Sequence, residues 1–293
     1  MNHDPNQKNE SNEKSVFGVI IHSFFVVPFL IAVFSVLLFA AVRILTMEKQ
    51  TVYDFLDDVK TGGLPKRWQA AFELSKILAN PALVPPDSKF DNEIIRAFDA
   101  AKNDDNRVRQ YLALAMGRTG KSVFIDPLLN GLKEEKEENL YAMIYALGLL
   151  KDLKAVPAIS AYLGHPDSRI RLVAVMALGN IGDPQVVNLL KKTLNDTEPN
   201  VQWDSAVALA KLHDRSGRAV LLKLLDRGYL AKFPEVDVQE QTHVVLVALE
   251  AAGPLNDPPL NEAISRLAHG DQNMNVRKLA MDIESKNQSR EIK

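Results

Sequence analysis

A repeat of 31 residues is the feature that most constrains how this chain can fold. A small residue recurs at this spacing, at Gly117, Gly148, Gly179 and Ala210, and a leucine or methionine precedes each one. Each of these segments is followed by a second apolar run, and related segments begin at residues 66, 238 and 275. Self-similarity at a fixed period of 20–50 residues is typical of a solenoid, here of about six helix pairs.

Each repeat has the pattern of a helix, a tight turn and a second helix. Acidic residues stand three positions before the leading apolar residue, where they can cap the first helix and favour its positive end. They are Asp105, Asp167, Glu198 and Glu235. A glycine at the end of the first helix is expected to supply a positive φ for the turn. Asp-Pro pairs at 126–127 and 183–184 then begin the second helix. The pattern predicts an all-α fold, an α-α superhelix.

Two stretches of the third clear unit resemble a known family. Residues 167–171 read DSRIR and residues 177–184 read ALGNIGDP, and both are similar to the HEAT-like repeats also found in phycobilisome lyases. The resemblance covers residues 64–285 and implies an armadillo-type solenoid whose first helices line a concave surface. Leu140 and Gln202 depart from it, since they replace the arginine present at 109, 171 and 277. An arginine–aspartate ladder along the array is therefore expected to be interrupted.

The N-terminal region divides into three parts of different character. Residues 1–15 are polar and are predicted to form a disordered tail. Residues 16–43 are predicted to form a transmembrane helix, because residues 16–42 contain no Asp, Glu, Lys or Arg and about 20 apolar residues span a bilayer. A cleaved signal peptide is the alternative, although its apolar region would be shorter, about 7–15 residues. Residues 48–63 are predicted to form an amphipathic capping helix, and residues 286–293 are expected to fray.

The flanks of the apolar segment give a weak indication of topology. Lys8 and Lys14 precede it, whereas Arg43, Lys49 and Lys60 follow it. Basic residues in short flanks favour the cytoplasmic side. We therefore expect a membrane-anchored, single-pass protein of the cell membrane with its solenoid on the cytoplasmic face.

Several classes of function are disfavoured by composition. The net charge of −2 lacks the basic excess of nucleic-acid-binding proteins, and there is no cysteine for a thiolate metal site or nucleophile. The six histidines form none of the spacings of metal sites. Residues 120–122 read GKS, as a P-loop ends, but they fall in an inter-helix turn and Ala115 replaces the first glycine. We predict no enzyme activity, catalytic residue, cofactor, metal or nucleotide.

The outward positions of the first helices carry the strongest functional signal. Two and six residues after each leading apolar residue, the side chains should be polar if they met only water. Ten of these twelve positions are apolar instead. They are Trp68, Phe72, Leu114, Tyr141, Tyr145, Leu172, Met176, Trp203, Val207 and Val244. An exposed apolar strip rich in Trp and Tyr is typical of a binding surface. Burial of the strip by curvature or bulky neighbours is the alternative.

The sequence therefore predicts a membrane-tethered scaffold or adaptor that binds a membrane-associated protein partner in its concave groove. Such a protein would be an accessory subunit of a membrane protein complex, held at raised effective concentration by its anchor. Two alternatives remain open. The resemblance to phycobilisome lyases implies a lyase-type enzyme or lyase chaperone that assists covalent attachment of a bilin, and an apolar groove could hold a lipid or other apolar ligand at the membrane surface.

Overall fold

The computed structural model describes residues 22–46, 50–133 and 135–291. The chain divides into two compact units, residues 1–51 and residues 52–293. In the first unit, a short π-helix, His22–Val26, continues into the helix α2, Val27–Thr46. The predicted tail, residues 1–15, lies outside the described residues.

The helix α2 has the length and composition of a membrane span. The segment Phe24–Val42, which runs from the π-helix into α2, has a mean hydropathy of 2.8, and none of it is buried inside the protein. A signal sequence close to the N-terminus shares these properties. The structure therefore supports one apolar helix that is able to cross a membrane, at the place the sequence predicted.

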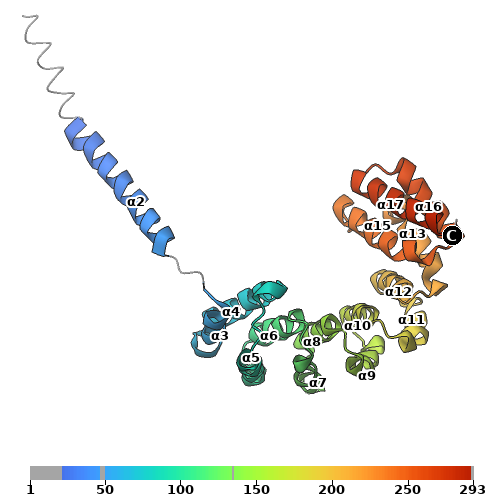
Figure 1. The fold of residues 1–293 in the computed structure, drawn as a ribbon, viewed down its shortest axis with the longest axis horizontal. Helices are drawn as coiled ribbons and strands as arrows, with labels where there is room; N and C mark the ends of the chain where they lie inside the picture. Colours follow the sequence, from blue (N-terminus) through green and yellow to red (C-terminus); the bar gives the residue numbers. More distant parts are fainter. Residues whose placement is uncertain (1–21, 47–49, 134, 292–293) are drawn as a thin grey trace, which may run out of the picture. The chain divides into compact units, whose positions relative to one another are not determined.

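The second unit is a solenoid of paired helices in two rows (Figure 1). The described part of the chain contains no strand, as predicted for an all-α superhelix. The first helices are α4 (Leu64–Ile77), α6 (Asn106–Arg118), α8 (Glu137–Leu150), α10 (Ser168–Ile181), α12 (Pro199–Lys211) and α15 (Val238–Ala252). The second helices are α5 (Ser88–Ala100), α7 (Ile125–Lys133), α9 (Val156–Ser160), α11 (Val187–Thr193), α13 (Arg218–Leu224) and α16 (Pro258–Gly270).

The helix α3, Val52–Thr61, covers the N-terminal end of this stack. Its Leu56 and Val59 are buried in the core. Arg67 of α4 donates a hydrogen bond from Nε to the carbonyl oxygen of Val59, at 2.8 Å. This helix lies within residues 48–63, which the sequence assigned to an amphipathic capping helix.

The periodic glycines lie where successive first helices touch. A Cβ on Gly117, Gly148 or Gly179 would approach an alanine of the next first helix within 2.7 Å. These contacts are to Ala146, Ala177 and Ala208 respectively. The glycines are therefore needed for close backbone approach inside helices, and not for a left-handed turn as the sequence suggested. Positive φ angles occur instead at Gly120 and Gly182, three residues further on.

The N-cap residues of the first helices are the predicted ones in two repeats and are not in two others. The carboxylates of Asp105 and Asp167 accept hydrogen bonds from the second backbone N–H after them, at 2.9 and 2.8 Å. Glu198 makes no side-chain cap, and α12 begins with a proline at its first position. The cap of α15 is Asp237 rather than Glu235, because the helix begins at Val238 and Asp237 forms a capping box with Glu240.

Arginines from the first helices tie neighbouring repeats together. Arg109, only 3% exposed, donates to Glu135 at 2.7 Å and to the carbonyl oxygen of Phe98 at 2.5 Å. Arg171 forms two hydrogen bonds of 2.7 Å with Asp196. In the following repeat Gln202 reaches only the carbonyl oxygen of Asp196, at 2.6 Å. The interruption expected from the sequence is therefore present at α12.

The regular stacking changes after α12. The leading apolar residues of α12 and α15 lie 37 positions apart rather than 31, and the insertion contains the short helix α14, Arg227–Leu230. Ala210 stands at the register position of the three contact glycines. The buried core divides into two clusters here, so that Val201 belongs to one and Trp203 to the other.

The last helix, α17, runs over Met274–Glu291. Asn287 is buried and donates from Nδ2 to the carbonyl oxygen of Gly253, at 3.2 Å, and to Oδ1 of Asn261, at 3.0 Å. The helix therefore continues into residues 286–291, for which the sequence predicts fraying, and these hydrogen bonds anchor it at Asn287.

Replacement of Gly148 by alanine tests the contact between α8 and α10. The new Cβ would meet the Cα and Cβ of Ala177 at 2.7 Å. Although alanine favours a helix by about 1 kcal/mol over glycine, overpacking should lower the free energy of unfolding by about 2 kcal/mol net. Denaturant unfolding followed by circular dichroism measures this. Gly270→Ala, where a Cβ meets nothing within 4 Å, is the control and should not destabilise. Equal stability of the two variants would contradict the assignment.

Candidate functional site

The predicted groove residues lie on the first helices with a range of exposures. Phe72 and Tyr141 are exposed at 37% and 44%. Half-buried are Trp68, Leu114, Tyr145, Leu172, Met176 and Val244. The rings of Tyr141 and Tyr145 stack with centroids 6.4 Å apart. The strip is therefore partly open, and its role in partner binding stays a prediction.

Two of the predicted groove residues, Trp203 and Val207, are buried at 8% and 7% exposure. The sequence placed them on an open strip. Trp203 is covered because the insertion after α13 packs two rings against it, with centroid distances of 6.4 Å to Tyr229 and 5.1 Å to Phe233. The 31-residue pattern gave no information about the fold of this insertion.

A cavity of about 610 Å³ opens where the regular stacking ends. Its volume is within the range of small-molecule sites, about 300–1,000 Å³. We call it the α12 pocket, and its lining comes from α10, α12, α13 and α15 with one residue of the insertion. The lining consists of Leu172, Met176, Asn200, Trp203, Asp204, Val207, Leu224, Val236, Gln239, Glu240, His243, Val244 and Val247. Five predicted groove residues are thus brought together here.

Asp204 is the unusual member of this lining. Within the described part of the chain its carboxylate has no hydrogen-bond or ion-pair partner, although the side chain is half-buried. Burial raises the pKa of Asp204 to about 6, and the charge of Lys211 lowers it only partly. A carboxyl group whose pKa is raised by burial next to apolar side chains is more frequent in functional sites than elsewhere.

Asp204 differs from the residues at the same position in the other repeats. At the same place in the repeat, the three preceding first helices have Tyr111, Ala142 and Val173, whereas α4 and α15 have Gln69 and Gln241. Ala142 and Val173 are 6% and 0% exposed. Asp204 is thus the one charged residue at a position that is otherwise apolar or an uncharged amide.

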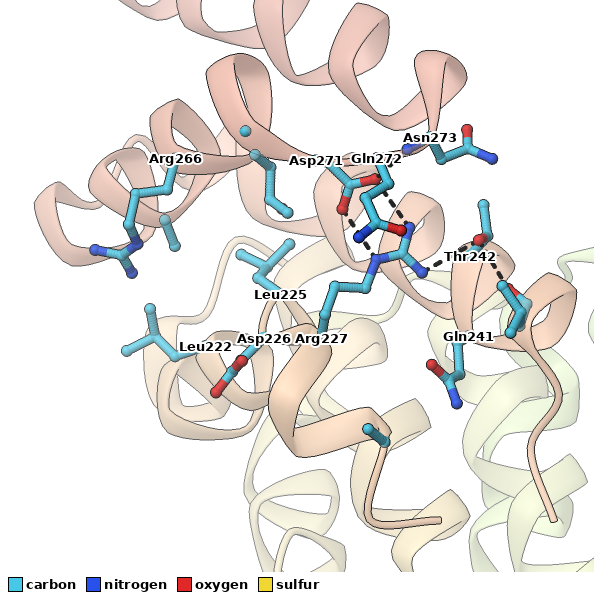
Figure 2. A pocket seen from close by; sticks show the side chains of 15 residues that line it. Leu222, Leu225, Asp226, Arg227, Gln241, Thr242, Arg266, Asp271, Gln272 and Asn273 are labelled. Carbon is cyan, nitrogen blue, oxygen red and sulfur yellow. Dashed lines mark hydrogen bonds and ion pairs between the residues drawn. The ribbon is translucent and has the colours of Figure 1, made fainter. Parts of the chain in front are cut away.

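A second cavity, of about 1070 Å³, lies among α13, α14, α15 and α16 (Figure 2). Figure 2 shows Arg227 at its centre, paired with Asp271. The guanidinium donates to the two carboxylate oxygens at 2.9 and 3.1 Å and to the hydroxyl of Thr242 at 3.1 Å. These contacts join the insertion to the last repeats, so the polar groups of this cavity have a structural explanation.

The segment 120–122, which reads like the end of a P-loop, follows α6 and runs into a 3-10 turn, Ser122–Phe124. The Lys121 ammonium is held by the carbonyl oxygen of Pro85 and by Asp91, both at 2.6 Å. It is therefore engaged in packing α6 to α5. Among the described residues no group of three or more histidine, aspartate or glutamate side chains is arranged to hold a metal ion.

Comparison with known proteins identifies the repeats. The family profile for HEAT repeats matches residues 125–210 and 156–230. The bilin biosynthesis protein PecE of a Nostoc species is 27% identical over 165 residues, which cover 56% of this chain and 61% of the relative. PecE of Mastigocladus laminosus is 27% identical over 174 residues, which cover 59% of this chain and 61% of the relative. The chain thus spans about three-fifths of the length of these relatives.

Among solved structures, the complex of CpcE and CpcF of phycocyanin lyase from a Nostoc species has the same fold. The TM-score is 0.56 with 20% identity, over 83% of this chain and 96% of the other. The prediction that this protein is not an enzyme is wrong, because the curated relatives are proteins of bilin biosynthesis. The absence of a recognisable catalytic motif was insufficient ground for it, since solenoid surfaces carry no motif of fixed spacing.

Replacement of Asp204 by asparagine should stabilise the protein. A rise in the pKa of an aspartate from 3.8 to about 6 corresponds to a penalty of about 3 kcal/mol at most at neutral pH. The folded state binds the proton more tightly than the unfolded state, so the penalty is present above pH 6 and disappears as the pH falls toward 4. The variant should therefore gain about 1–3 kcal/mol in free energy of unfolding at pH 7.5 and about 0.5 kcal/mol at pH 4.

Urea unfolding at both pH values measures this difference. Asp282→Asn, at an exposed position on α17, removes the same charge and should change little at either pH. A pH-independent effect of Asp204→Asn would show that burial does not perturb this carboxyl group.

Proposed function

The chain belongs to the HEAT-like repeat family, and from this premise we propose that its concave groove binds a segment of a partner protein. The observation that carries the proposal is the partly open aromatic strip on the first helices, which includes the exposed Phe72 and Tyr141 and leads to the α12 pocket. Aromatic side chains contribute most to binding energy at protein interfaces. HEAT-type solenoids use extended concave surfaces of this kind for binding.

The helix α2 supplies the second part of the proposal. With Phe24–Val42 in a membrane, the solenoid would stay close to the bilayer and meet a membrane-associated partner at raised effective concentration. The protein would then be an accessory subunit of a membrane protein complex, with the solenoid on the cytoplasmic face. The CpcE–CpcF complex, which has the same fold, supports the general idea of a partner chain.

A double substitution, Phe72→Ser with Tyr141→Ser, tests the groove. Both side chains are exposed, so their loss should cost little stability while it removes apolar area from the interface. We expect partner crosslinks, measured by mass spectrometry in native membranes, to fall by about tenfold. Crosslinks from residues of the first helices should be lost preferentially.

The matched control is Leu153→Ser, which removes an exposed apolar side chain from the turn before α9. It should leave the crosslinks unchanged. Unchanged crosslinks in the double variant would contradict the proposal, provided that circular dichroism shows that the double variant and the control are folded.

A lyase-type role toward a bilin is the second candidate, favoured by the likeness to PecE. A bilin is a linear tetrapyrrole with a long apolar body and pyrrole N–H groups. The α12 pocket combines apolar walls from Leu172, Met176 and Val244 with the carboxylate of Asp204, which can accept hydrogen bonds from such groups. The pocket volume of about 610 Å³ suits a ligand of this class.

Addition of biliverdin to the full chain in detergent tests this candidate. Binding in the α12 pocket should shift the visible absorbance of the tetrapyrrole, because its ring conformation and protonation depend on the surroundings. Asp204→Asn should weaken binding by about tenfold through loss of a charge-assisted hydrogen bond, whereas Asp282→Asn should not. An unchanged spectrum at all biliverdin concentrations would remove the bilin candidate and leave partner binding unaffected.

A further inference from the structure

The charged side chains that line the α12 pocket are acidic. Its lining includes two carboxylates, Asp204 and Glu240, and no lysine or arginine. Glu240 is engaged at the start of α15, where its carboxylate accepts a hydrogen bond from the backbone N–H of Asp237 at 3.3 Å. Asp204, which makes no such bond among the described residues and is half-buried, is the carboxylate of this pocket with both oxygens available to an incoming group.

The surrounding titratable groups do not neutralise Asp204. Lys211 of the same helix donates to Oδ1 of Asn180 at 3.0 Å, and its charge acts on Asp204 only through space. His243 of α15 is exposed at the edge of the pocket. On α8, Tyr141 has a pKa raised by burial first, then by Tyr145 and by the charge of Asp204. The negative charge of Asp204 therefore also acts on Tyr141.

We infer that the α12 pocket receives a lysine or arginine side chain from the partner segment that lies along the groove. Long basic side chains pack their methylene groups on apolar surface while the charged end reaches a polar partner. Leu172, Met176 and Val244 would contact the methylene groups, and the carboxylate of Asp204 would meet the charged end. The inference rests on the proposed function, because it specifies the partner that the groove binds.

The geometry of the solenoid sets the spacing in such a partner. One helix, α10, separates α8 with Tyr141 from α12 with Asp204. At 8–10 Å between packed helix axes, the axes of α8 and α12 are about 16–20 Å apart, and the side chains of Tyr141 and Asp204 are closer than their axes, since the charge of Asp204 still acts on Tyr141. A bound helix rises 1.5 Å per residue, so about 11 residues, which share one face with the first, cover the distance between the axes. The partner segment should therefore present an apolar anchor and a basic residue on one face, at most about 11 positions apart.

Selection from a displayed peptide library tests this inference. The library contains helical peptides of about 18 residues with an apolar stripe in which one stripe position at a time is randomised. It is selected in parallel on the full chain in phosphatidylcholine nanodiscs and on the variants Asp204→Asn and Asp282→Asn. We expect lysine or arginine to be enriched at one end of the stripe on the wild type and on Asp282→Asn, but not on Asp204→Asn.

A selected peptide is then compared with its norleucine variant, which has a similar chain without the charge. Fluorescence anisotropy should report about tenfold weaker binding of the norleucine peptide to the wild type and equal binding of both to Asp204→Asn. Equal binding of both peptides to the wild type would overturn the basic-residue inference alone. Failure of every library peptide to bind the wild type would overturn the inference and also count against the groove as a peptide site.

Discussion

The close contact between glycine and alanine on successive first helices is the interaction on which the regular part of the solenoid depends. Gly117, Gly148 and Gly179 each lie against an alanine with no room for a Cβ. Backbones that approach this closely exclude water and allow the flanking leucines to interlock. Because the contact recurs in every regular repeat, it fixes both the separation and the register of the first helices. The aromatic strip that the first helices carry is aligned as a consequence.

The α12 pocket lies where this contact is absent. Ala210 takes the place of the glycine, six additional residues follow, and the α12 pocket opens between α12 and α15. The insertion then stabilises the irregular junction by two means. Its Tyr229 and Phe233 pack against Trp203, and its half-buried Arg227 forms an ion pair with the buried Asp271. The junction is therefore packed and ion-paired, although the repeat pattern has been broken.

The sequence was sufficient for the fold because one period determines it. The first helices follow from the spacing of the glycines, and the caps at Asp105 and Asp167 from short-range geometry. The site was only partly predictable. Periodicity identifies which side chains face outward in a regular repeat, but it does not describe an insertion, and the insertion decides that Trp203 is buried. Asp204 was detectable in principle, as the one charged residue at its position in the repeats.

Under the proposed function, Asp204 would contribute to binding although it lowers the stability of the free protein. A valine at this position, as in the preceding repeat at Val173, would be compatible with burial and would avoid the desolvation that raises the pKa of the carboxyl group. The repeat fold can tolerate the penalty because each repeat is stabilised by its neighbours. A basic partner group would remove the penalty on binding. The desolvation of Asp204 destabilises the free protein. Its relief on binding would then favour partners with a basic group over partners without one.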